Sequence, residues 1–100
     1  MDMQKMMKEL QKMQGKMSRI QEEMENTTFE AEMGGVVKVV MNGKFEVQQI
    51  KIAKEAVDPD DVEALEDLIL ATVNAAKAKV DEASQDKMGG ITKGLKLPGF

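Results

Sequence analysis

The stretch from residue 3 to residue 24 repeats apolar side chains at alternating spacings of three and four, and this repeat constrains the fold more than any other feature. It consists of Met3, Met6, Leu10, Met13, Met17, Ile20 and Met24. Such spacing places all seven side chains on one side of an α-helix, as in coiled coils. Asp2 suits the N-cap, and Asn26 begins a run of turn formers. We therefore predict a helix over residues 3–24 that carries this methionine-rich set, the apolar seam.

Basic residues follow a second stripe along the same helix. At about 100° per residue they fall within an arc of roughly 80°, centred about 130° from the apolar seam. This set, the basic stripe, consists of Lys5, Lys8, Lys12, Lys16 and Arg19. A solvated lysine face on a core-facing helix is the commoner explanation of such a pattern. The alternative is an arm whose basic stripe contacts a polyanion.

The formal net charge of −4 conceals an uneven distribution along the chain. Residues 2–20 hold five basic side chains and two acidic ones, a net of +3. Residues 84–100 hold Lys87, Lys93 and Lys96 against one acidic side chain, a net of +2. Charges more than about 8–10 Å apart are screened at physiological salt, so a polyanion would respond to the local field. The two ends of the sequence favour a polyanion, whereas its acidic middle repels one.

Composition argues against catalysis. The chain has no cysteine, histidine, tryptophan or tyrosine, which removes disulfides, thiolate and imidazole metal ligands, and the commonest catalytic groups. There is no glycine-rich phosphate loop. We expect no enzyme activity, no cofactor, no metal and no small-molecule substrate. No apolar run approaches the roughly 20 residues of a membrane span and no signal-peptide pattern is present, so we expect a cytoplasmic location without a membrane partner.

The middle of the chain predicts a three-stranded antiparallel meander. Thr27–Met33, Val36–Met41 and Lys44–Ile52 are rich in β-branched and aromatic residues. Gly34-Gly35 and Asn42-Gly43 separate them and favour two-residue turns.

Turns of that length fix the predicted register, because they place Met33 opposite Val36 and Val40 opposite Phe45. One face then collects Phe29, Ala31, Met33, Val36, Val40, Phe45 and Val47. The opposite face carries a smaller apolar strip, Val37, Val39 and Met41. A single β-bulge at Gln48-Gln49 is needed to return Ile50 and Ile52 to the first face.

A second long helix follows the meander. Asp58 fits its N-cap and Pro59 its first turn, and an apolar stripe continues from Val62 to Ala83. Periodicity ends at Gln85, and the rest is rich in glycine. We expect a single α+β domain over residues 1–87 and a flexible glycine-rich tail over residues 88–100.

These elements give an α+β protein of order α-β-β-β-α, in which two long helices flank the meander. The first helix is about 31 Å long at 1.5 Å per residue, whereas three strands are only about 15 Å wide. The helices should therefore overhang the sheet, and a homodimer would cover the exposed seams.

The order of elements resembles the YbaB/EbfC family of small bacterial nucleoid-associated proteins. The resemblance is carried by Met6–Gln14, the glycine turn before Val36–Val39, Asn42-Gly43-Lys44, Asp67–Ala76 and Leu97-Pro98-Gly99-Phe100. It implies a tweezer-like homodimer whose paired sheets form the body and whose helices form the arms. It also implies binding of double-stranded DNA, an altered DNA conformation and a role in organising the nucleoid. The candidate DNA-binding residues of the basic stripe come from the helical wheel alone.

Two function classes remain open. In the first, the protein is an architectural DNA binder whose basic stripe contacts phosphates of duplex DNA with little sequence specificity. A single arginine and three phenylalanines favour phosphate contacts over base reading or stacking. In the second, the protein is an adaptor whose methionine seam binds helices of a recombination or replication protein. Phosphate binding should weaken steeply with salt, whereas binding to a methionine groove should not.

Overall fold

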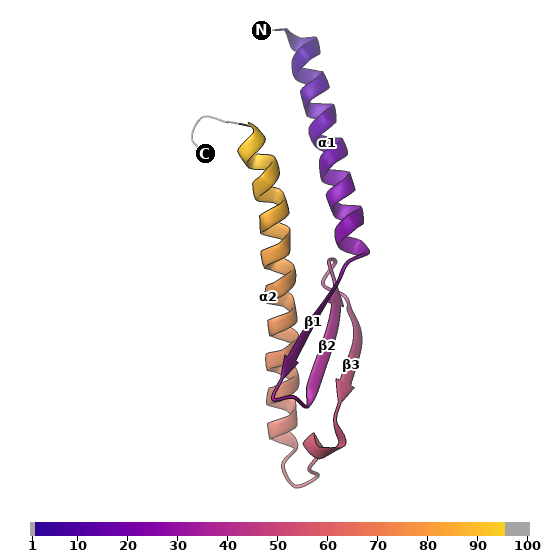
Figure 1. The fold of residues 1–100 in the computed structure, drawn as a ribbon, viewed down its shortest axis with the longest axis vertical. Helices are drawn as coiled ribbons and strands as arrows, with labels where there is room; N and C mark the ends of the chain where they lie inside the picture. Colours follow the sequence, from indigo (N-terminus) through magenta and orange to yellow (C-terminus); the bar gives the residue numbers. More distant parts are fainter. Residues whose placement is uncertain (1, 96–100) are drawn as a thin grey trace.

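The structure, a computed structural model, describes residues 2–95, and within this range the side chains of residues 2–89. The elements along the chain are α1 (Met3–Glu25), β1 (Thr28–Met33), β2 (Val37–Asn42), β3 (Val47–Ile52), the short 3-10 helix η1 (Lys54–Ala56) and α2 (Val62–Leu95) (Figure 1). This order confirms the predicted α-β-β-β-α architecture of the α+β class. The division of the chain at residue 87 stays a prediction.

The described chain is strongly elongated. It measures 70 × 26 × 16 Å and has a Cα radius of gyration of 19.6 Å. A compact domain of this length would have a radius of gyration of about 13 Å. In Figure 1 α1 and α2 run antiparallel, the sheet lies beside the first half of α2, and α1 extends away from the sheet as an arm. Most of α1 therefore has no core to pack against.

Helix α1 begins and ends close to the predicted residues. The Oδ1 atom of Asp2 accepts a hydrogen bond from the Gln4 amide at 3.0 Å, which confirms Asp2 as the N-cap. At the other end the Asn26 side-chain amide donates to the Glu22 carbonyl at 3.0 Å. Only the last turns of α1 reach the core, where Met24 is 6% exposed and Ile20 packs against the buried cluster.

The register between β1 and β2 differs from the predicted one by one residue. Met33 pairs with Val37 and Phe29 with Met41, so the predicted pairing of Met33 with Val36 is wrong. Gly34 and Gly35 do adopt left-handed φ angles of +62° and +70°. Val36 also lies in the loop, however, so three residues and not two connect Met33 with its partner Val37. Because side chains alternate along a strand, this shift of one residue places Val37, Val39 and Met41 of β2, and not Val36 and Val40, on the same face as Phe29, Ala31 and Met33 of β1.

In β2 the core consequently uses the strip that the sequence pattern assigned to the second face, Val37, Val39 and Met41. Helix α2 packs over β1 and β2. The buried side chains are Ala31, Val37, Val39 and Met41 from the sheet, Thr72, Ala76 and Val80 from α2, and Met24 from α1. Val40 is only half-buried and Phe45 is exposed, so their predicted place in the core is wrong.

The turn between β2 and β3 is also longer than predicted. The Asn42 amide donates to the Glu46 carbonyl at 3.0 Å, and the Phe45 amide donates to the Asn42 carbonyl at 3.1 Å. Phe45, and not Asn42 or Gly43, takes the left-handed conformation, with φ at 63°. A three-residue loop that ends on a left-handed residue is a common alternative to the two-residue turn. The predicted two-residue turn is wrong.

The predicted β-bulge in β3 is confirmed. Val40 pairs with Gln49 and Met41 pairs with Val47, which leaves Gln48 as the additional residue. Beyond the bulge Ile50 pairs with Val39, and Ile52 pairs with Val37. Both isoleucines therefore lie on the same face as the buried residues of β2.

Helix α2 starts later and ends later than the sequence pattern indicated. Asp61, and not Asp58, accepts a hydrogen bond from the first turn, at 3.3 Å from the Ala64 amide. Asp58 instead accepts from the Asp60 amide in the preceding turn. The helix continues to Leu95, so the expected end near Gln85 is wrong, and residues 96–100 lie outside the described residues.

Candidate nucleic-acid interface

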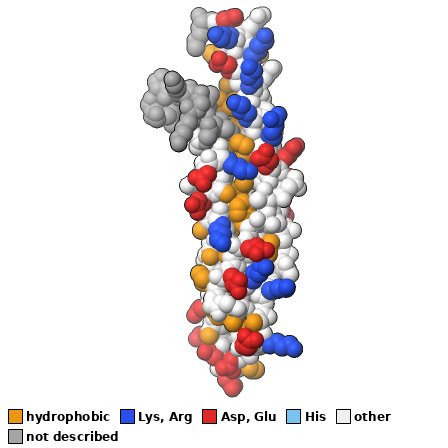
Figure 2. Space-filling model, in the orientation of Figure 1, with side chains coloured by type: hydrophobic (Ala, Val, Ile, Leu, Met, Phe, Trp, Pro, Cys, Tyr) orange, Lys and Arg blue, Asp and Glu red, His pale blue; other side chains and the backbone are white. Residues whose placement is uncertain are grey.

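The structure places all five residues of the basic stripe on α1 with exposed side chains. None of them forms an ion pair with another described residue. Figure 2 shows blue side chains gathered along the arm, whereas red ones gather at the opposite end of the molecule. From Lys5 to Arg19 the stripe is about 21 Å long at 1.5 Å per residue. Five cations are thus presented in one row, and none of them forms an ion pair with a described residue.

Acidic residues at the base of the arm have cationic partners. The Lys87 ammonium lies 3.1 Å from a carboxylate oxygen of Glu23, and the Lys44 ammonium lies 3.2 Å from one of Glu25. Such exposed pairs contribute at most about 1 kcal/mol to stability. Their electrostatic effect is to offset negative charge next to the stripe.

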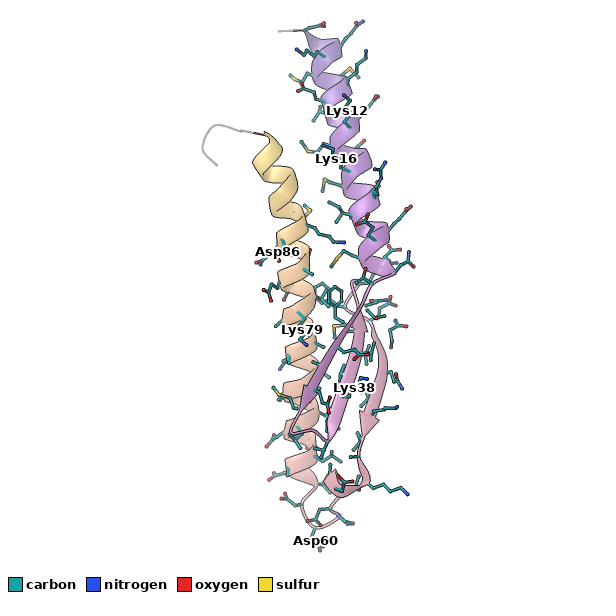
Figure 3. The ribbon with its side chains drawn as sticks, in the orientation of Figure 1. Lys12, Lys16, Lys38, Asp60, Lys79 and Asp86 are labelled. Atoms are coloured by element: carbon teal, nitrogen blue, oxygen red, sulfur yellow. The ribbon has the colours of Figure 1, made fainter. Side chains whose placement is uncertain are left out.

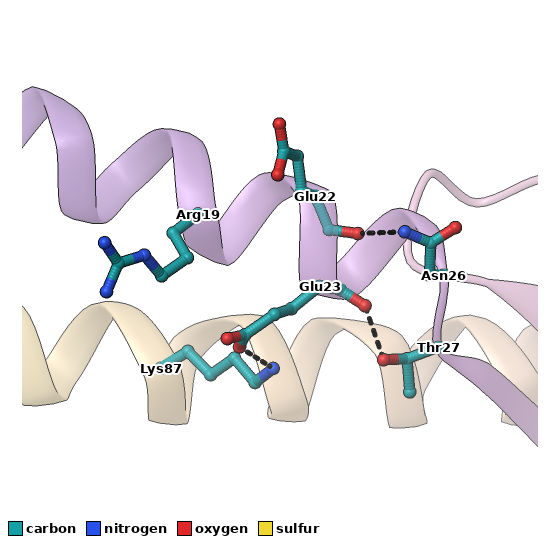
Figure 4. Close-up of a pocket in the computed structure, with 6 residues that line it drawn as sticks. All are labelled: Arg19, Glu22, Glu23, Asn26, Thr27 and Lys87. Atoms are coloured by element: carbon teal, nitrogen blue, oxygen red, sulfur yellow. Dashed lines mark hydrogen bonds and ion pairs between the residues drawn. The ribbon is translucent and has the colours of Figure 1, made fainter.

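A surface hollow of about 530 Å³ lies between α1 and α2 at the end of the basic stripe. It is lined by Arg19, Glu22, Glu23, Asn26, Thr27 and Lys87 (Figure 4). In Figure 4 the Arg19 guanidinium points away from the Glu23–Lys87 pair. Lys87, which the sequence placed beside a flexible tail, therefore belongs to the helix that lies against the arm. Because the sequence pattern indicated a helix end near Gln85, it did not predict that Lys87 lies next to α1.

The loop between β2 and β3 contacts the C-terminal end of α1. The Gly43 amide donates to the Met24 carbonyl at 2.9 Å. A Cβ atom at Gly43 would lie 2.2 Å from that carbonyl oxygen. The glycine therefore allows a close approach between hairpin and helix, a role that its place in a predicted turn does not reveal.

Figure 3 places Lys12 and Lys16 on the part of α1 beyond the sheet, far from Asp60 at the other end. Within residues 2–95 no cluster of three acidic, histidine or cysteine side chains is arranged to hold a metal ion. Neither of the long helices in that range contains an apolar segment of the length that a membrane span requires. What the described surface offers is a row of cations on a projecting helix.

The fold and this row of cations define a small α+β protein with one positively charged helical arm. The chain belongs to the YbaB/EbfC DNA-binding family, whose sequence model matches residues 1–95. The resemblance to this family is thereby confirmed.

Relatives and a solved structure agree with this assignment. A nucleoid-associated protein of Pelotomaculum thermopropionicum is 52% identical over 100 residues, covering 99% of this chain and 95% of the relative. One from a Roseiflexus species is 51% identical over 88 residues, covering 88% of each chain. The crystal structure of an uncharacterized protein from Helicobacter pylori matches with a TM-score of 0.81 at 22% identity, covering 92% of this chain and 98% of that chain. This last likeness concerns the fold.

Proposed function

We propose that this protein is a nucleoid-associated protein that binds duplex DNA through the basic stripe of α1, with little sequence specificity. The observation that carries the proposal is the row of five exposed cations on a projecting helix, none of which forms an ion pair with the described part of the chain. Membership of a DNA-binding family and the names of the relatives support DNA as the partner and the nucleoid of the cytoplasm as its location.

The dimensions of the stripe suit a duplex. Double-stranded DNA carries one negative charge per about 1.7 Å of its axis, so a row about 21 Å long faces many phosphates. Lysine ammonium groups contact phosphates as point charges and carry little information about base sequence. The stripe contains one arginine, the side chain best suited to read guanine. Binding should therefore be largely independent of sequence.

We further infer that the protein acts as a homodimer. Val47, Ile50 and Ile52 of β3 lie on the face that α2 covers over β1 and β2, yet they are 44%, 45% and 40% exposed. A contiguous apolar surface of this kind favours association, and two copies can cover it through a two-fold contact. Two arms fixed by one symmetry axis would hold a duplex at two places and alter its conformation.

A salt titration of DNA binding tests the role of the basic stripe. A dimer offers up to ten cations, and if about half contact phosphates at once, the slope of log K against log salt should be about −4 to −5. The variant K8Q/K12Q/K16Q should bind unrelated duplexes more weakly by similar factors and give a shallower slope. The control variant K51Q/K54Q/K77Q removes the same charge from exposed positions outside α1 and should keep the steep slope.

Unchanged affinity together with an unchanged slope in K8Q/K12Q/K16Q would contradict the proposal. Circular dichroism serves as the folding control, because the three lysines are exposed and lie away from the apolar seam. Binding that is weak and insensitive to salt in the unmodified protein would favour the adaptor function of the seam instead.

A further inference from the structure

A shallow apolar groove runs along α1 in the part of the arm that extends beyond the sheet. It has a volume of about 290 Å³, and we call it the arm groove. Its lining residues are Met7, Leu10, Gln11, Met13, Gln14 and Met17. Met7 is 58% exposed and Leu10 is 55% exposed, although both side chains are large and apolar. Exposed apolar surface of this kind usually marks an interaction site.

The arm groove continues toward the loop between β2 and β3. Met17 also lines a second hollow, of about 640 Å³, together with Gln21 and the exposed ring of Phe45. The two hollows share Met17, so one track follows α1 from Met7 to Gln21. This track is about 21 Å long at 1.5 Å per residue. Its length suits a helix and not a small ligand.

Charged side chains are confined to one side of the arm. At about 100° per residue, those between Met3 and Gln21 fall within an arc of roughly 100°. They are Lys5, Lys8, Glu9, Lys12, Lys16 and Arg19. The remaining surface, about 260° wide, carries no charge, although the solvated face of a helix is normally polar and charged. The arm groove lies in the middle of this uncharged surface, about 180° from the middle of the basic stripe.

The lining of the arm groove repeats as a coiled-coil heptad. Met7 and Gln14 occupy a positions, and Leu10 and Met17 occupy d positions. In this frame the six charged side chains take only b, c and f positions, which point away from a partner helix. The e and g positions normally carry the charges that select a partner. Here they are uncharged, namely Gln4, Met6, Gln11, Met13, Ser18 and Ile20.

We propose that the arm groove binds the α1 helix of a second copy of this chain, in antiparallel orientation. Charge complementarity selects this occupant. A helix that enters the groove must carry no charge on its contact face, and a second α1 presents the same uncharged face. The sheet and most of α2 lie toward the C-terminal end of α1, so antiparallel arms place the two bodies at opposite ends of the pair (Figure 1).

The heptad also predicts the register of the pair. With its centre near residue 12, Met7 of one arm packs on Met17 of the other, and Leu10 packs on Gln14. This register overlaps the arms over residues 3–21, whereas a slip of one heptad toward the tips leaves only residues 3–14. The two basic stripes then face outward on surfaces about 20 Å apart. Their repulsion is largely screened at that distance in physiological salt.

This contact is separate from the proposed β3 contact and does not rest on DNA binding. It would stabilise an arm that lacks a core, because an isolated helix of this length is marginal in water. Glutamine at the a positions limits the buried apolar area, so the pair should form reversibly. Two different two-fold contacts on one chain would join more than two copies.

Cysteine cross-linking tests the pairing, because the chain contains no cysteine and an introduced thiol is unique. Gln11 lies next to the predicted two-fold axis, so Gln11→Cys chains should be linked in pairs by a short bifunctional maleimide. The matched control is Lys12→Cys, which is also exposed but lies on the outer face and should give little linkage. Equal linkage of the two variants, or no linkage of Q11C, would overturn the proposal.

Mixtures of two variants test the orientation. The register places Gln4 of one arm beside Ser18 of the other, and both residues are exposed. Q4C chains should therefore be linked to S18C chains, whereas each variant alone should stay unlinked. Linkage of Q4C chains to one another would indicate parallel arms and overturn the proposal.

Second substitutions separate the arm contact from the β3 contact. Leu10→Glu should abolish the linkage of Q11C without changing the circular dichroism spectrum, because Leu10 is exposed on the arm. Ile50→Asp should leave the linkage intact, because β3 does not contribute to the arm groove. Linkage that survives L10E, or that is lost in I50D, would overturn the proposal. The measurements use no DNA, so their outcome is independent of the proposed function.

Discussion

Substitution of Gly43 by alanine should separate the hairpin from the base of the arm. The added Cβ atom would lie 2.2 Å from the Met24 carbonyl oxygen, 2.5 Å from its carbonyl carbon and 2.6 Å from its Cβ atom. Two of these atoms are backbone at the end of α1, so no side-chain rotation relieves the contact. The hairpin tip or the helix end must move, and the hydrogen bond from the Gly43 amide is lost.

The expected loss in the free energy of unfolding is the sum of the lost hydrogen bond and the steric contact. A net hydrogen bond contributes about 1 kcal/mol. Forcing an additional methyl group into a packed contact costs about 1–3 kcal/mol. The free energy of unfolding should therefore fall by about 2–4 kcal/mol in G43A. For a domain of this size each 1 kcal/mol lowers the Tm by about 4–8 °C, so a decrease of at least ~8 °C is expected.

Thermal and urea unfolding monitored by circular dichroism measure this loss. Gly15→Ala is the matched control, because a Cβ atom at Gly15 would have no neighbour within 4 Å. Alanine in a helix interior is favoured over glycine by about 1 kcal/mol, so G15A should raise the Tm by a few degrees. A G43A variant as stable as the unmodified protein would refute the close contact between hairpin and arm.

Further substitutions test the sheet and the base of the arm. Asn42→Ala should lower the free energy of unfolding by about 1–3 kcal/mol in urea titrations, because its side chain holds three hydrogen bonds across the hairpin loop; no change would contradict that role. Val39→Asp should destabilise each chain by more than about 4 kcal/mol, since Val39 is completely buried. Ile50→Asp should leave the circular dichroism spectrum intact but halve the mass seen by light scattering, and an unchanged mass would place the dimer contact elsewhere. Lys87→Gln should change the free energy of unfolding by no more than about 1 kcal/mol, because the Glu23–Lys87 pair is exposed, and a larger loss would show that the pair fixes α1 on α2.

The helical arm and its basic stripe could be predicted because both depend on local spacing. A repeat of three and four residues specifies a helix and its faces without reference to the rest of the chain. The N-cap at Asp2 follows from the same local chemistry. The bulge at Gln48 could also be predicted, because the alternation of apolar and polar residues is interrupted between Val47 and Ile50.

The neighbours of the arm could not be predicted in this way. Lys87 reaches Glu23 only because α2 continues past the last periodic residue and lies along α1. Gly43 meets the Met24 carbonyl only because the hairpin folds against the end of the helix. In both cases the two residues are far apart in the sequence, so no local sequence pattern indicates that they are close in space.

The sequence by itself determined the class of the fold, the order of its elements and the positive face of α1, because periodicity, turn residues and charge act within a few residues of each other. Only the tertiary structure decided which face of the sheet is buried. Loop lengths set the register, and a single additional loop residue, Val36, reversed which side chains of β2 share a face with those of β1. Packing of α2 over β1 and β2 then buried Val37, Val39 and Met41 and left the apolar residues of β3 exposed. Because side chains alternate along a strand, one additional residue in a loop changes which side chains are buried and which stay exposed to contact a partner.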